Sequence, residues 1–457
     1  MPLAKDRGEE VADARTVDAR AVRPVRMTWL LDLPIEATQV LAPVYLVAVV
    51  LVVALLVPRP GVRAATRIWW PAALAAAGVG ALAGTVAVWI VVDVQDVFGA
   101  PASSVIRGAA ATAGAGCGLA IANLVRTRWW RKILAFVAIP AVLIAGGLMI
   151  NRDVAYYPKL GDALGLTGVS ALALGHANDT ESSLRLWKPP PGMPSGGTVG
   201  TVRIPGTNSR WDGRPAWVYV PPAGRVAHPP KLPVVIAFAG QPGGPSDVFV
   251  AGGLQSMVDA IAAAHHGLAP VVVVPDQLGA YNMNPMCVNS KMGNVARYVT
   301  EDVRDWVLKH LPVSANRREW TVAGFSQGGT CAVQFGTGYP AIFGSYLAIS
   351  PEIGPINGSL ARTLRDAFHG SRSAWEAAQP IAIMKRHRPY RQTTALYCVG
   401  ALDRRYGAVV PELAAASSAA GMRVSSTALP GVAHNWNTGA AGFRWGLQRL
   451  VPWWGLP

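Results

Sequence analysis

The stretch Trp320-Thr-Val-Ala-Gly324-Phe-Ser326-Gln-Gly328-Gly-Thr-Cys-Ala decides the fold of this chain. It places the pattern Gly-x-Ser-x-Gly directly between a predicted strand, 320–323, and a predicted helix, 327–338. A serine on so tight a strand-to-helix turn needs small neighbours, because larger ones would collide with the adjoining strand and helix. The pattern therefore predicts a nucleophile elbow with Ser326 at its tip.

Strands and helices are predicted to alternate on both sides of this elbow. The predicted strands are short β-rich runs at 199–204, 216–220, 234–238, 271–274, 320–323, 345–349, 395–399 and 424–428. Helix-like segments lie near 246–265, 295–310, 327–338, 409–420 and 440–450. Such alternation predicts a mostly parallel, doubly wound sheet with helices on both faces. The first two strands have only turn signals between them, so an antiparallel hairpin should begin the sheet, a combination typical of α/β-hydrolases.

The first 150 residues have a different character. The chain has 457 residues, of which 51% are hydrophobic and only 15% charged, and long apolar runs gather near the N-terminus. Four of these runs, 37–57, 71–92, 104–125 and 133–150, approach the roughly 20 residues that a helix needs to cross a bilayer. We therefore expect a tail at 1–36, a four-helix transmembrane anchor at 37–150, a linker at 151–196 and an α/β-hydrolase domain at 197–457.

Basic residues predict how the anchor is oriented. Seven lie in two short loops, 58–70 and 126–132, and the positive-inside rule places these loops in the cytoplasm. The hydrolase domain is then extracytoplasmic, although Arg20, Arg23 and Arg26 in the tail favour the opposite orientation. Gly80 with Gly84 and Gly114 with Gly118 would allow the second and third helices to pack closely, or would simply reflect Ala/Gly-rich sequence.

A serine nucleophile requires a histidine base and an acid that holds the histidine in the correct tautomer. In this fold the order along the chain is Ser, acid, His. His434 follows the last predicted strand and precedes the final helix, a setting that His369 and His387 lack. Two strand ends offer a carboxylate, Glu352 and Asp403, and Asp403 is preferred because its strand immediately precedes that of the histidine.

The negative charge that develops on a substrate carbonyl oxygen needs donors fixed in advance, each contributing about 3 kcal/mol in comparable sites. The backbone N–H of Gln327 should supply one. The Gln241 N–H, in the loop after strand 234–238, should supply the other. We expect no cofactor and no metal site, since CxxC and His-rich spacings do not occur among the four cysteines and eight histidines.

The segment from about 198 to 457 resembles the esterase D and antigen 85 branch of the α/β-hydrolases, and the whole layout resembles membrane-bound envelope esterases. The resemblance rests on Trp217-Val-Tyr-Val-Pro-Pro, Ala239-Gly-Gln, Val274-Pro-Asp, the Gly-Phe-Ser-Gln-Gly-Gly elbow and His434-Asn-Trp. It implies acyl-ester chemistry, substrate contacts at Gly240 and Trp436, and a disulfide between Cys287 and Cys331. Ala239 departs from the family, which usually has an acidic residue or histidine there.

Together these features predict a serine esterase that cleaves an acyl ester of a lipid or envelope component through an acyl-enzyme. Acyl transfer to an alcohol, and a scaffold without turnover, are the alternatives. The net charge is +15, yet the second half lacks a basic run interleaved with aromatic residues, so we expect an anionic membrane or envelope surface as neighbour and no nucleic acid. The substrate and the oligomeric state are not encoded in any recognisable motif.

Overall fold

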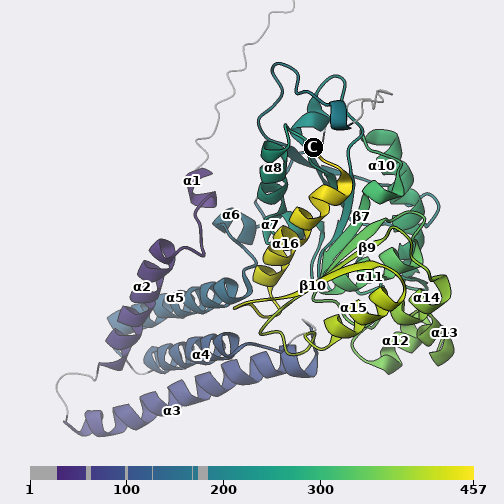
Figure 1. The fold of residues 1–457 in the computed structure, drawn as a ribbon. Helices are drawn as coiled ribbons and strands as arrows, with labels where there is room; N and C mark the ends of the chain where they lie inside the picture. Colours follow the sequence, from purple (N-terminus) through teal and green to yellow (C-terminus); the bar gives the residue numbers. More distant parts are fainter. Residues whose placement is uncertain (1–27, 58–62, 98–100, 126, 167, 173–183) are drawn as a thin grey trace, which may run out of the picture.

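The computed structural model describes residues 28–57, 63–97, 101–125, 127–166, 168–172 and 184–457. Most of the predicted tail, including Arg20, Arg23 and Arg26, lies outside these ranges. Four long apolar helices form the N-terminal part (Figure 1). They are α2 (Thr38–Leu56), α3 (Arg63–Val88) continued by a π-helical turn η1 (Trp89–Val94), α4 (Ser104–Leu124) and α5 (Trp129–Val154).

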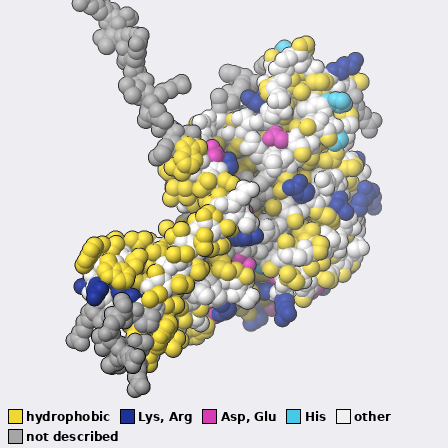
Figure 2. All heavy atoms as spheres, turned by 90° about the vertical axis from the view of Figure 1, so that its left-hand side faces the viewer, with side chains coloured by type: hydrophobic (Ala, Val, Ile, Leu, Met, Phe, Trp, Pro, Cys, Tyr) yellow, Lys and Arg dark blue, Asp and Glu magenta, His cyan; other side chains and the backbone are white. Residues whose placement is uncertain are grey.

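Each of these helices is long and apolar enough to cross a membrane, with mean hydropathy between 1.4 and 2.6 over its best window. At most 22% of any such window is buried within the protein, so most of the apolar surface points outward. Figure 2 shows hydrophobic side chains covering the protruding bundle. Exposing so much apolar surface to water is unfavourable, which is consistent with helices that span a membrane.

The glycine pairs bring α3 and α4 into backbone contact. A Cβ added at Gly80 would lie 2.0 Å from the Gly114 carbonyl oxygen, and one added at Gly118 would lie 2.1 Å from the Ala76 oxygen. Only glycine therefore permits this approach, which is the packing that small residues allow between transmembrane helices. Of the two explanations for the glycines, close packing is the one that the structure supports.

The C-terminal part contains an eight-stranded sheet in the order β1-β2-β4-β3-β7-β8-β9-β10. The strands are β1 (Thr198–Val202), β2 (Ala216–Val220), β3 (Val234–Phe238), β4 (Val271–Val274), β7 (Trp320–Phe325), β8 (Ser345–Ile349), β9 (Thr394–Gly400) and β10 (Arg423–Leu429). β2 pairs antiparallel with both β1 and β4, whereas the other neighbours are parallel. A parallel sheet in this order with an antiparallel second strand is the α/β-hydrolase topology. A separate two-stranded sheet is formed by β5 (Asn289–Ser290) and β6 (Gly293–Asn294).

Helices cover both faces of the sheet (Figure 1). α8 (Leu254–Ala264) and α16 (Trp436–Trp454) lie on one face, and α11 (Gln327–Gly338), α14 (Pro380–His387) and α15 (Val409–Ala419) lie on the other. Every residue of β3, β4, β7, β8 and β9 is buried, as expected for strands covered on both faces. The remaining helices are short: α1 (Thr28–Leu31), α6 (Leu160–Ala163), η2 (Leu184–Leu186), η3 (Pro222–Arg225), α7 (Pro245–Val250), α9 (Val295–Arg297), η4 (Tyr298–Val303), α10 (Arg304–His310), η5 (Arg317–Glu319), α12 (Leu360–Ala367) and α13 (Arg372–Ala377).

Several predicted helix boundaries were wrong for local reasons. The segment 246–265 is two helices, α7 and α8, because Gly253 adopts φ +60° between them. The final helix begins four residues earlier than predicted, where the Asn435 side chain accepts a hydrogen bond from the Thr438 N–H. Helices α12, α13 and α14 were not predicted at all.

The predicted linker contacts the hydrolase domain at several of its described residues. Ala171 forms a parallel bridge with Thr201 of β1, and the Trp187 indole donates to the His266 carbonyl at 3.0 Å. Helix α6 instead contacts α1. Residues 167 and 173–183 of that linker lie outside the described ranges.

One end of the helix bundle meets the hydrolase domain. The Ser103 hydroxyl, which caps α4, donates to the Asp153 carboxylate near the end of α5 at 2.6 Å. The Ile35 N–H, before α2, donates to the Pro158 carbonyl at 3.1 Å. The C-terminal ends of α2 and α4 must consequently lie at the opposite end of the bundle. Of the basic residues in the two predicted loops, Arg63 and Arg67 lie at the start of α3, and Arg131 and Lys132 lie at the start of α5, at this same end.

Candidate active site

Ser326 occupies a strained turn between β7 and α11. Its φ of +58° and ψ of −120° lie in a region that non-glycine residues rarely adopt, at a cost on the order of 1–3 kcal/mol. The turn is possible because the residues two positions before and after Ser326, Gly324 and Gly328, have no side chains. A Cβ at Gly324 would lie 2.2 Å from the Gly328 carbonyl oxygen, and a Cβ at Gly328 would lie 2.4 Å from the Phe238 oxygen.

The predicted serine, histidine and acid converge at the carboxyl ends of the strands. Ser326 Oγ lies 2.8 Å from His434 Nε2, and His434 Nδ1 lies 2.7 Å from Asp403 Oδ2. Ser326 follows β7, Asp403 follows β9 and His434 follows β10, so three strand ends position three groups. A proton can pass from the hydroxyl to the imidazole while the carboxylate holds the other ring nitrogen.

Asp403 is suited to remain ionised. Burial acts to raise its pKa, but the hydrogen bond and charge of His434, with a 3.1 Å bond from the Tyr406 N–H, outweigh burial and hold the pKa below its usual value. The carboxylate therefore accepts from Nδ1 and leaves Nε2 free to accept the serine proton.

The alternative acid, Glu352, lies elsewhere. Its carboxylate accepts from the Thr330 hydroxyl at 3.4 Å, and burial raises its pKa to about 8. Glu412, a weaker candidate acid because it falls in the helix-like run 409–420, is exposed on α15. His369 is exposed after α12, and His387 Nδ1 faces the Thr337 carbonyl. None of these groups takes the place of Asp403 or His434.

The proposed oxyanion donors flank the serine. Gln327 is the first residue of α11, and the first N–H groups of a helix have no acceptor within it. The loop after β3 touches the serine itself, since a Cβ at Gly240 would lie 3.3 Å from the Ser326 Cβ. The next residue, Gln241, donates its side-chain amide to the Asn282 carbonyl at 3.2 Å, which anchors the loop. A carbonyl attacked by Ser326 would lie between these two segments.

A family model, Esterase, described as “Putative esterase”, matches residues 213–451, which include the serine, the acid and the histidine. The chain belongs to this esterase family. A relative in Corynebacterium glutamicum, an uncharacterized protein, is 30% identical over 319 residues, covering 67% of this chain and 73% of its own.

Solved structures similar to the esterase domain include an S-formylglutathione hydrolase from Agrobacterium tumefaciens and a ferulic acid esterase. The first is 19% identical with a TM-score of 0.47, over 56% of this chain and 95% of its own. The second is 16% identical with a TM-score of 0.49, over 57% of this chain and 99% of its own.

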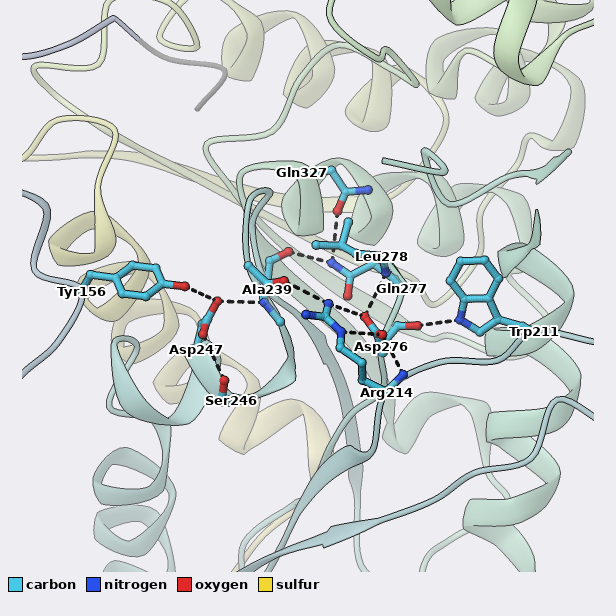
Figure 3. Close-up of polar contacts among 12 residues, drawn as sticks. Tyr156, Trp211, Arg214, Ala239, Ser246, Asp247, Asp276, Gln277, Leu278 and Gln327 are labelled. Carbon is cyan, nitrogen blue, oxygen red and sulfur yellow. Dashed lines mark hydrogen bonds and ion pairs between the residues drawn. The ribbon is translucent and has the colours of Figure 1, made fainter. Parts of the chain in front are cut away.

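The side chain of Gln327 connects the turn that carries Ser326 to the loop after β3, residues 239–244, which is called the oxyanion loop below. The side-chain oxygen of Gln327 accepts from Gln277 Nε2 at 3.1 Å, and Gln277 Nε2 also donates to the Ala239 carbonyl at 2.8 Å (Figure 3). Gln327 Nε2 in turn donates to Asn284 Oδ1 at 3.1 Å. Both Gln277 and Asn284 were missed from the sequence, because a single glutamine or asparagine in a loop forms no motif.

An ion pair between the half-buried Arg214 and the buried Asp276 supports the same loop. Arg214 donates to Asp276 through its backbone N–H, Nε and Nη2, each at 2.8 Å, and also to the Gly243 carbonyl at 2.9 Å (Figure 3). Burial acts to raise the pKa of Asp276, but these bonds and the charge of Arg214 keep it below its usual value. In the sequence, Val274-Pro-Asp276 contributes to the family resemblance but does not indicate the ion pair with Arg214.

Two residues expected from the family resemblance have different surroundings. Gly240 lies against the nucleophile, where a substrate would pass. Trp436, by contrast, is only 6% exposed and packs on Phe325 with ring centroids 5.1 Å apart. Its ring offers a substrate little surface, so the structure gives Trp436 a packing role instead of the expected substrate contact.

The structure joins Cys287 and Cys331 in a disulfide. Cys331 lies one helical turn after Gln327 on α11, and Cys287 lies in the loop that also holds Asn284. The crosslink thus fastens the loop that positions Gln327 to the helix that begins at the nucleophile. Cys398 is buried in β9 and Cys117 lies in α4, and both are free thiols.

Proposed function

We propose that this chain is a membrane-bound serine esterase that cleaves an acyl ester of a lipid or cell-envelope component on the extracytoplasmic face of the membrane. The observation that carries the proposal is the continuous chain of hydrogen bonds from Ser326 Oγ through His434 to Asp403, at 2.8 and 2.7 Å. Family membership supplies the reaction class, ester hydrolysis.

The reaction proceeds in two steps. Ser326 Oγ attacks the ester carbonyl while His434 Nε2 takes its proton, and the oxyanion accepts hydrogen bonds from the Gln327 and Gln241 N–H groups. The tetrahedral intermediate expels the alcohol, which receives the proton from His434, and leaves an acyl-enzyme. Water then attacks the acyl group, again through His434, and releases the acid and the free serine.

The membrane location is supported by the four apolar helices, and the orientation by charge. The basic starts of α3 and α5 lie at the end of the bundle away from the hydrolase domain, and under the positive-inside rule this supports an extracytoplasmic domain. The Cys287–Cys331 disulfide is consistent with an oxidising compartment.

A lipid-derived substrate is supported by the surroundings of the site. Leu402, which precedes the acid, is 62% exposed, and Tyr281, whose carbonyl accepts from the Gly243 N–H of the oxyanion loop, is 52% exposed. Exposed apolar groups on the acid loop and against the loop of the proposed oxyanion donor, at the end of a bundle of apolar helices, suit an acyl chain that arrives from a bilayer.

The test is comparative lipid profiling of membranes that carry the wild-type protein or the Ser326→Ala variant, with labelling by a fluorophosphonate probe. We expect the variant to lose labelling and one class of ester lipid to accumulate. Ser256→Ala is the matched control, because this exposed serine bonds only the Gly253 carbonyl on α8. Labelling that persists in Ser326→Ala would contradict the assignment.

Hydrolysis and acyl transfer share the acyl-enzyme and differ only in what resolves it. Incubation with an ester and a sugar acceptor distinguishes them, since transfer yields an acylated sugar and hydrolysis a free acid. Failure of the wild-type protein to cleave any ester or react with the probe would favour the alternative of a scaffold without turnover.

A further inference from the structure

Residues at the hydrolase-facing ends of the long apolar helices, or within two residues after them, contact all three loops that carry the catalytic groups. Tyr156, just after α5, reaches the oxyanion loop through Asp247. The Asp153 carbonyl, in the last turn of α5, reaches the residue after His434. Asp96, after η1, reaches Arg405, two residues past the acid. A simple tether would not need to touch each of these loops.

The strongest of these contacts is at the oxyanion loop. Asp247 Oδ2 accepts from the Tyr156 hydroxyl and from the Gly244 N–H, both at 2.8 Å, and Asp247 is only 8% exposed (Figure 3). Burial raises the pKa of Asp247 even though both bonds act to lower it. Loss of the tyrosine hydroxyl would leave this buried carboxyl with one fewer donor, which frees the loop that it holds.

The second contact fixes the start of α16. Asn435 Nδ2 donates to the Asp153 carbonyl at 2.9 Å, while its Oδ1 accepts from the Thr438 N–H at 3.3 Å. The Asp153 carboxylate is bound by Ser103, the cap of α4. The backbone that carries His434 is therefore joined to the ends of two membrane helices.

The third contact lies beside the acid. Arg405 and Asp96 form an ion pair at 3.3 Å with side chains 43% and 35% exposed, so it contributes little by itself. The next residue, Tyr406, donates its N–H to Asp403 and stacks on His434 with ring centroids 4.3 Å apart. The ion pair thus adds a third restraint on the same set of loops.

We propose that the hydrolase-facing ends of the membrane helices are positioning elements of the active site, with Tyr156, Asp153 and Asp96 holding the oxyanion, histidine and acid loops. The membrane segment then increases the rate of ester cleavage itself, even for a water-soluble ester that never enters a bilayer. This inference rests on the proposed function, because it requires Ser326 to be the nucleophile.

The test uses the full-length protein in detergent micelles with p-nitrophenyl acetate, a substrate that needs no delivery from a membrane. We expect Tyr156→Phe to lower kcat about tenfold with KM within about twofold, an unchanged pH profile and a correspondingly slower fluorophosphonate labelling. Tyr157→Phe is the matched control: this neighbour is held through its backbone N–H by Asn151, and we expect wild-type rates.

Asn435→Ser gives an independent measurement. Serine is as good an N-cap as asparagine but cannot reach Asp153, so α16 should form while kcat falls several-fold. To separate a loss of positioning from a loss of stability, rates are measured well below the melting temperature of each variant.

Variants Tyr156→Phe and Asn435→Ser with lowered melting temperatures but wild-type kcat would overturn the inference and leave the contacts purely structural. A wild-type protein that neither hydrolyses the ester nor labels at Ser326 would instead contradict the proposed function.

Discussion

Replacing Asp403 with Asn tests the tautomer argument most directly. Asp403 Oδ1 accepts from the Tyr406 N–H at 3.1 Å, and Oδ2 accepts from His434 Nδ1 at 2.7 Å. An asparagine must keep its oxygen toward the Tyr406 donor, which turns its NH2 group toward the imidazole. Nδ1 then becomes an acceptor, and the ring proton moves to Nε2, the nitrogen that faces Ser326.

In that tautomer the histidine cannot accept the serine proton. In a comparable triad the same substitution lowers kcat about 10⁴-fold, equivalent to about 5.4 kcal/mol of transition-state stabilisation. The assay is steady-state hydrolysis of p-nitrophenyl acetate, with fluorophosphonate labelling as a second readout and thermal unfolding to verify folding.

Glu352→Gln is the matched control, because it neutralises the other carboxylate that follows a strand near the elbow. We expect this variant to stay within about tenfold of wild type. If Asp403→Asn retained activity while Glu352→Gln lost it, the acid would be Glu352 and the reasoning from the 2.7 Å contact would be refuted.

Three further outcomes are expected. Gly328→Ala would place a Cβ 2.4 Å from the Phe238 oxygen. This variant should lower the free energy of unfolding by at least about 3 kcal/mol and abolish labelling by the fluorophosphonate probe. Near-normal melting and labelling would contradict the tight-turn argument. Cys287→Ser with Cys331→Ser opens a 44-residue loop and should lower the free energy of unfolding by about 4 kcal/mol, measured by thermal or denaturant unfolding against wild type. Folding raises the pKa of Glu352 from 4.5 to about 8, so the folded state keeps a proton that the unfolded state releases. As the pH rises between these two pKa values, the free energy of unfolding falls by up to about 1.4 kcal/mol per pH unit. The melting temperature of Glu352→Gln should therefore fall less than that of wild type from about pH 6 to pH 8, and an equal fall would show that the carboxyl does not titrate there.

The sequence predicted the elements whose signal is local. The eight strands and the four apolar runs were predicted close to where the structure has them, because a continuous apolar or β-rich run is a local signal, although α3 begins at Arg63, eight residues before the predicted run at 71–92. Asp403 was preferred over Glu352 by the order of strands alone, and the structure places Asp403 rather than Glu352 against His434.

What the sequence did not reveal depends on contacts between distant segments. Helices α12 to α14 are short, and the caps of the first two, Ser359 and Ser371, were not recognised. The hydrogen bond from Tyr156 to Asp247 joins residues 91 positions apart, and no periodic pattern records such a pairing. The substrate contact expected of Trp436 could not be judged from sequence, because a tryptophan two residues after the histidine can face the core as easily as the substrate.

The place of His434 immediately before α16 ties the candidate base to long-range packing. α16 packs on β7, β8 and β9, and the residue before its cap holds the imidazole 2.8 Å from Ser326 Oγ. A chain in which α16 is detached from the sheet would keep the strained serine turn but lose the base, so hydrolysis should report the docking of this helix and not merely the presence of the turn.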